Sequence, residues 1–155
     1  MYKYEKLLDE AHKSNVSVDE NYRFKGKTSG LYIDGNIALS DKLDTNAAKA
    51  CVLAEELGHH HTSAGNILDL SDSGNRKQEH QARLWAYDHQ IGLNNIIKAY
   101  EHGCRNRYEV AEYLEITEEF LEEAIIIYRE KYGVCTVIGK YCIMFIPQLT
   151  VGKMF

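Results

Sequence analysis

An apolar run at residues 47–54, AAKACVLA, leads directly into the stretch EELGHHH, which holds two glutamates and three histidines. Carboxylates are excluded from apolar surroundings unless a partner compensates them. Helix positions four apart project from the same face, about 6 Å between Cβ atoms, so Glu55 stands beside His59 and Glu56 beside His60. A carboxylate and an imidazole one turn apart can bind one metal ion. This helix is therefore a candidate metal site.

The spacing follows the zinc-protease motif H-E-x-x-H, whose outer residues hold the metal while the inner glutamate acts as general base. Residues 55–59 are E-E-L-G-H, which makes Glu55 and His59 the candidate ligands and Glu56 the candidate base. A catalytic zinc site needs a third protein ligand. The best candidate is Glu79, in a predicted helix over residues 75–90, NRKQEHQARLWAYDHQ.

Two small residues, Ala82 and Ala86, share the face of Glu79 and would let another helix approach closely. Gly58 also suggests close packing of two helices. A glycine inside a helix costs about 1 kcal/mol relative to alanine, so its presence there indicates that a neighbouring element leaves no room for a side chain. The simpler interpretation stays open. Most E-x-x-x-H pairs are solvated ion pairs, and histidines at a helix end suit the helix dipole.

The surrounding pattern predicts an α+β fold dominated by helices. A helix is expected over residues 1–13, and the Asp34-Gly35 pair predicts a hairpin over 31–39. Asp44 or Thr45 is the expected cap of the helix that carries the EELGHHH stretch, which should end near Gly65. Residues 92–133 are expected to be helical in three or four pieces, and Gly139-Lys140 predicts a C-terminal hairpin.

Composition narrows the class of protein. The chain has 155 residues, a formal net charge of −5 and a pI near 5.8, which argues against a general nucleic-acid binder and an anionic membrane surface. It has no run approaching the roughly 18 apolar residues of a membrane helix, and its first residues lack the apolar region of a signal peptide. Its four cysteines lie far apart without a C-x-x-C pair and are expected to be buried free thiols. Together these features favour a reducing cytoplasm.

The stretches KACVLAEELGHHHTSAGNILD and NRKQEHQARLWAYDHQIGL resemble the ImmA/IrrE family of metallopeptidases, which phages and mobile elements carry. The likeness extends upstream through GLYIDGNIALS and downstream through YEVAEYLEITEEFLEEAIIIYREKYG, covering roughly residues 1–133. In that family two histidines of H-E-x-x-H and a glutamate on the following helix hold zinc. The resemblance places these roles on Glu55, His59 and Glu79, with Glu56 as base. The spacing leads to the same four positions.

The resemblance also implies an architecture and a partner. It implies a zincin-like metallopeptidase core over residues 1–91, with a small N-terminal β-hairpin or sheet. A helix-turn-helix-like segment over 92–133, and the hairpin that the residues themselves predict over 134–155, are expected to pack on this core as a single compact unit. Members of this type are antirepressors that cleave or bind a helix-turn-helix repressor, so a repressor is the expected protein partner.

Glu55 replaces the first histidine of the motif. Two carboxylates and one imidazole neutralise a divalent ion, so water on it should be less acidic and the ion a weaker Lewis acid. Zinc accepts carboxylate oxygen, and the harder donor set also suits Mn²⁺ or Fe²⁺. Secondary candidates are His60 and His61, to orient ligands, and Tyr32, Tyr87 and His89, to stabilise an oxyanion.

The sequence leaves two other functions as alternatives to a peptidase. The first alternative is DNA binding. A helix-turn-helix core has apolar residues at the spacing seen here for Val110, Ala111, Leu114 and Ile116. The second helix, however, would begin with Glu118 and Glu119 and also carry Glu122 and Glu123. These acids would repel phosphates, so no direct nucleic-acid binding is expected. The second alternative is a non-catalytic antirepressor that binds its partner with or without metal. Glu55 favours it, whereas Glu56 favours the enzyme.

Overall fold

The computed structural model describes residues 2–62 and 72–154, with side chains in the second range from residue 76 onward. The contacts divide the chain into two compact units, residues 1–86 and 87–155. The boundary between the two units falls inside α3 (Asp72–Gln90). The division into a core, a helical segment and a C-terminal hairpin stays a prediction.

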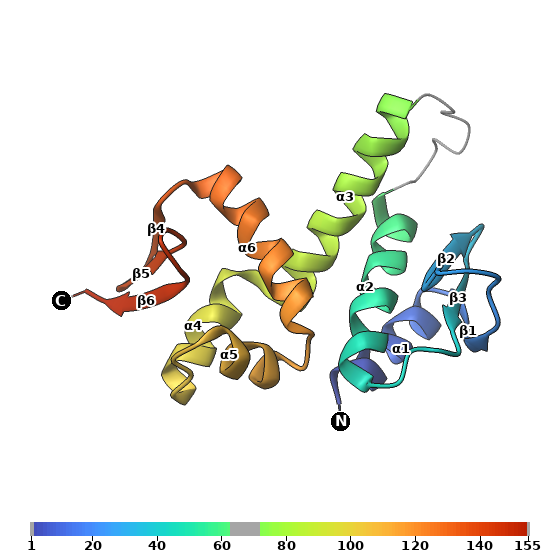
Figure 1. The fold of residues 1–155 in the computed structure, drawn as a ribbon, viewed down its shortest axis with the longest axis horizontal. Coiled ribbons are helices and arrows are strands. Elements are labelled where there is room, and N and C mark those ends of the chain that lie inside the picture. Colours follow the sequence, from blue (N-terminus) through green and yellow to red (C-terminus); the bar gives the residue numbers. More distant parts are fainter. Residues whose placement is uncertain (1, 63–71, 155) are drawn as a thin grey trace. The chain divides into compact units, whose positions relative to one another are not determined.

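The first unit combines helices with a small sheet (Figure 1). Its further elements are α1 (Lys3–Lys13), β1 (Ser17–Tyr22), β2 (Gly30–Ile33), β3 (Asn36–Ser40) and α2 (Asn46–Thr62). The predicted hairpin is confirmed: β2 and β3 are antiparallel, and Asp34 and Gly35 both have positive φ in the turn between them. The predicted end of α2 near Gly65 lies outside the described residues.

The sheet has the order β1-β3-β2, so the hairpin leaves β2 at an edge. Strand β1 was not predicted, because Ser17–Tyr22 is polar and mostly exposed. It pairs with β3 in parallel, with Ser17 opposite Asn36. Helix α2 contacts both β2 and β3, and α1 contacts α2. The result is a two-layer packing of helices on a sheet.

Helix α2 buries most of its apolar side chains in the core and keeps its two glutamates partly exposed. Thr45 is the cap, since its Oγ1 accepts a hydrogen bond from the Ala48 backbone N–H at 3.0 Å. Leu53 and Leu57 are almost fully buried in the core, whereas Glu55 and Glu56 are half-buried. The apolar run thus anchors the helix and holds its acids at the edge of the core.

The second unit holds three further helices: α4 (Gly92–His102), α5 (Arg107–Leu114) and α6 (Glu118–Tyr132). The three helices agree with the predicted division of residues 92–133 into three or four pieces. Gly103 is in the left-handed conformation after α4, and Thr117 caps α6. The predicted core residues of α5 and the turn after it are all buried: Val110, Ala111, Leu114 and Ile116.

The C-terminal strands form a sheet of three, not a simple hairpin: β4 (Cys135–Ile138), β5 (Tyr141–Met144) and β6 (Thr150–Lys153). The predicted turn at Gly139-Lys140 is confirmed, and β6 adds antiparallel to β5. Strand β6 has only four residues and is largely exposed, so its sequence carries a weak strand signal. The α+β fold dominated by helices is confirmed.

The cysteines divide into two kinds. Cys51 and Cys104 are buried free thiols, as expected. The expectation of burial is wrong for Cys135, which is exposed, and for Cys142, which is half-buried. Both lie in the small C-terminal sheet, on a face that the other described elements leave partly accessible. Among the described residues, no helix combines the length and apolar character needed to cross a membrane.

Candidate metal and peptidase site

Helices α2 and α3 bring two of the predicted ligands together. His59 Nε2 lies 3.2 Å from Glu79 Oε1. The His59 side chain is 20% exposed and the Glu79 side chain 56%, so the pair sits at the surface end of the interface between the two helices. Two ligands of a tetrahedral zinc ion, each bonded at 2.0–2.1 Å, lie roughly 3.3 Å apart. The observed separation therefore fits two donors to one ion.

The close approach of the two helices depends on Gly58. A Cβ on Gly58 would collide with the Ala82 carbonyl oxygen and would lie 3.0 Å from the carbonyl carbon. Ala82 itself is fully buried. The glycine on α2 and the alanine on α3 thus let the two backbones touch one residue before His59. This confirms the prediction that Gly58 marks close packing.

Glu56 lies against strand β2. A Cβ on Gly30 would lie 3.2 Å from Glu56 Cγ and 3.3 Å from Glu56 Oε1, so the absence of a side chain at residue 30 leaves room for the glutamate. Burial first, and then the negative charges of Glu55 and Glu79, together raise the pKa of Glu56 to about 7. The three carboxyl groups are therefore close enough to influence one another.

The complete three-ligand set is not preformed. Within the part of the chain that the structure describes, no three His, Cys, Asp or Glu side chains lie close enough together to hold a metal ion. Glu55 is half-buried and engaged in an interaction of its own. Its role as a ligand stays a prediction, and the His59–Glu79 contact is the part of the site that the structure brings together.

The neighbouring histidines have aromatic partners. His60 Nδ1 lies 2.7 Å from the Tyr32 hydroxyl of β2, which links the predicted orienting histidine to the hairpin. His61 stacks on Trp85 of α3, with ring centroids 4.8 Å apart. These contacts tie the end of α2 to β2 on one side and to α3 on the other.

The other two oxyanion candidates belong to the second unit. Tyr87 is 2% exposed, and its hydroxyl donates a hydrogen bond to Glu123 at 3.0 Å. Its ring packs edge-on against Phe120, so Tyr87 serves as a core residue of that unit. His89 is exposed.

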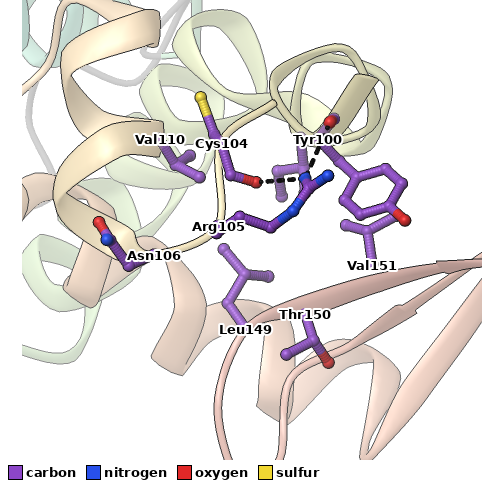
Figure 2. Close-up of a pocket in the computed structure, with 9 residues that line it drawn as sticks. Tyr100, Cys104, Arg105, Asn106, Val110, Leu149, Thr150 and Val151 are labelled. Atoms are coloured by element: carbon purple, nitrogen blue, oxygen red, sulfur yellow. Dashed lines mark hydrogen bonds between the residues drawn. The ribbon is translucent and has the colours of Figure 1, made fainter. Parts of the chain in front are cut away.

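Figure 2 shows a hollow of about 120 Å³ in the second unit, between the α4–α5 connection and β6. The Arg105 guanidinium on its wall is already engaged: it donates to the backbone oxygens of Tyr100 and Cys104 and stacks on the Tyr100 ring. Ligand sites usually enclose 300–1,000 Å³, and neither a carboxylate nor a histidine lines this hollow.

Sequence reasoning missed two residues at the candidate site. Gly30, which makes room for Glu56, precedes the hairpin and looks like an ordinary turn residue. Trp85 is the single tryptophan of the chain and falls six residues after Glu79, but nothing in its spacing points to His61. Both contacts join segments that are distant along the chain.

Comparison with known families identifies a matching family model. The peptidase M78 family model, described as the IrrE N-terminal-like domain, matches residues 8–125. The match spans α2, α3 and every residue of the candidate site. No curated protein and no solved structure matches the chain significantly.

Proposed function

The chain belongs to the IrrE N-terminal-like family of peptidases, and on that premise we propose that it is a zincin-like, metal-dependent peptidase acting on a transcriptional repressor. One observation carries the proposal: His59 and Glu79 approach to 3.2 Å across two helices of the matched domain. They are the positions to which both the motif spacing and the family resemblance assign the metal.

His59 and Glu79, with Glu55 as third donor, are the residues that would hold the ion. Imidazole nitrogen and carboxylate oxygen are both ordinary zinc ligands, and a set with two carboxylates also suits Mn²⁺ or Fe²⁺. A divalent ion bound there would polarise the scissile carbonyl and make water more acidic.

Glu56 is the proposed general base. Its carboxylate stands one residue from Glu55 and one turn before His60, and it faces the edge strand β2 across Gly30. From this position it would take the proton of the attacking water and pass it to the leaving amine. The Tyr32–His60 hydrogen bond would hold β2 and α2 in register beside it.

The edge strand β2 is the proposed docking place for the substrate backbone. Leu31 and Ile33 are exposed on it, and an edge strand offers unpaired N–H and C=O groups to an extended peptide. The proposed substrate is a helix-turn-helix repressor of a phage or mobile element. A basic DNA-binding protein would complement the net charge of −5.

A second candidate is an antirepressor that binds the same partner without cutting it. Two observations favour it: Glu55 stands where the family motif has histidine, and the described residues hold no preformed three-ligand group. Glu56 argues for the enzyme, since a binding module has no chemical need for a base there.

Elemental analysis of protein purified without a metal-affinity tag tests the metal site. The expected result is about one divalent ion per chain, lost in His59→Ala and in Glu79→Ala. His80→Ala is the matched control, because His80 is the exposed neighbour of Glu79 and has no proposed role. A wild-type protein that stays metal-free after incubation with Zn²⁺ or Mn²⁺ and removal of the excess would refute metal dependence.

A second experiment distinguishes the peptidase from the non-catalytic antirepressor. The protein is incubated with a helix-turn-helix repressor of the proposed class. The enzyme should cleave the repressor, and Glu56→Gln should slow cleavage by at least about 100-fold while leaving the bound metal in place. A metal-loaded wild-type protein that binds the repressor and leaves it whole would establish the non-catalytic antirepressor instead.

A further inference from the structure

Three sulfur-containing side chains share one face of the β4–β5 hairpin. Cys135 lies opposite Met144 in the antiparallel register, and Val137 lies opposite Cys142. Opposite residues project to the same side of a sheet, and so do alternate residues of one strand. The other face carries Ile143, which is fully buried. Cys135 and Met144 are exposed and Cys142 is half-buried, so the sulfur-bearing face is the accessible one.

The two thiols on this face are in contact. Cys135 and Cys142 are diagonal neighbours in the register, and their side chains form a hydrogen bond. On its other side Cys142 lies opposite Gly152 of β6. A Cβ on Gly152 would meet no atom within 4 Å. The space beside the thiol pair is therefore open to an incoming ion.

The diagonal placement favours an ion over a disulfide. Disulfide formation requires Cα atoms about 4.4–6.8 Å apart, whereas diagonal residues of an antiparallel pair are about 7–8 Å apart. A disulfide would therefore need the paired strands to shift, but an ion lying between two sulfurs spans a longer gap. Val137 on this face adds no oxygen or nitrogen donor. Strand β6 extends the face with Gly152, opposite Cys142, and with the neutral hydroxyl residue Thr150, opposite Met144. The charged donors are therefore the two thiolates, and soft thiolate and thioether ligands favour Cu(I).

We propose that Cys135, Cys142 and Met144 form a binding site for a soft monovalent cation of the Cu(I) class. The ion forms bonds to two thiolates and to the Met144 thioether, the two thiol protons pass to solvent, and no electron is transferred. The site uses none of the residues of the proposed peptidase site and stands independently of it.

Anaerobic titration of the reduced full-length protein with Cu(I), in competition with a chromogenic Cu(I) chelator, tests the site. The expected result is one tightly held ion per chain. Cys135→Ser and Cys142→Ser should each weaken binding by more than roughly 100-fold, beyond the effect of an outer-shell change. Met144→Leu keeps the volume of the side chain and should weaken binding less than either cysteine variant, because the thioether is a neutral donor whereas each thiolate carries a charge.

Two controls isolate the thiol pair. Cys104→Ser removes a buried thiol that donates to the Glu109 carbonyl, and it should bind Cu(I) as the wild type does. So should the His59→Ala, Glu79→Ala double variant. Circular dichroism verifies the fold, and Cys135→Ala replaces the serine variant should that one unfold. Wild-type affinity in both cysteine variants, or a reduced protein that binds no Cu(I) and closes a Cys135–Cys142 disulfide in air, would overturn the proposal.

Discussion

Gly58 is the residue on which the approach of α2 and α3 depends. Its hydrogen atom occupies the place where any side chain would meet the Ala82 backbone, and the next residue, His59, contacts Glu79. The packing of a single glycine therefore controls the distance between the proposed ligands.

Gly58→Ala should lower the free energy of unfolding by about 1–3 kcal/mol, because the overpacking outweighs the gain in helix propensity. It should also weaken metal binding, since α3 must move away from His59. Urea denaturation and metal titration measure the two effects. Gly152→Ala is the matched control, because a Cβ there has open space. Equal stability of the two variants would contradict the role assigned to Gly58.

Glu56 makes the stability of the metal-free protein depend on pH. Burial, and then the charges of Glu55 and Glu79, raise its pKa from 4.5 to about 7 in the folded chain. Between these values the unfolded chain loses the proton first, so the folded state loses stability as the pH rises and recovers it below about 4.5.

In chelator-treated protein, the Glu56 contribution should lower the free energy of unfolding by on the order of 1–3 kcal/mol between pH 4.5 and pH 8. Urea denaturation across this range measures the slope. Glu56→Gln cannot ionise and should flatten that part of the profile. Parallel profiles for the two proteins would show that Glu56 keeps an ordinary pKa.

Among the secondary-structure elements, α2 carries the proposed base and two of the proposed ligands, and its start depends on a single capping residue. Thr45 Oγ1 accepts the Ala48 N–H, and no Asp or Glu stands in the first turn to assist. Thr45→Ala should therefore cost about 1 kcal/mol of stability, measured by thermal or urea unfolding. Thr45→Ser keeps the oxygen and should retain most of the stability. A serine variant as unstable as the alanine variant would mean that the methyl group matters and the cap does not.

At the scale of the whole molecule, the charge distribution bears on what the protein binds. The chain carries a net charge of −5, and Glu118, Glu119 and Glu123 are exposed at and near the start of α6. In a helix-turn-helix this is the helix that would enter the major groove. Duplex DNA should therefore not be retained at roughly 0.1 M salt in an electrophoretic shift assay. Binding that weakens steeply as salt increases would contradict this.

Features that depend on neighbouring residues along the chain were predictable from the sequence alone. The apolar run before Glu55 predicts a helix with its acids at the core boundary, Asp34-Gly35 predicts the hairpin, and Thr45 was one of two expected caps. Each rests on local periodicity, turn chemistry or capping. The same local signals predicted His59 and Glu79 as partners, because Gly58 and two alanines suggested close helices.

Contacts between distant segments became evident only from the three-dimensional fold. Ser17–Tyr22 forms strand β1 because it pairs with β3. Its residues are polar and mostly exposed, so they show no pattern that would predict this pairing. The space for Glu56 comes from Gly30, 26 positions earlier in the chain. The thiols of Cys135 and Cys142 meet because the register of β4 and β5 makes them diagonal neighbours. Such contacts depend on register and on the packing of side chains, which periodicity alone does not encode.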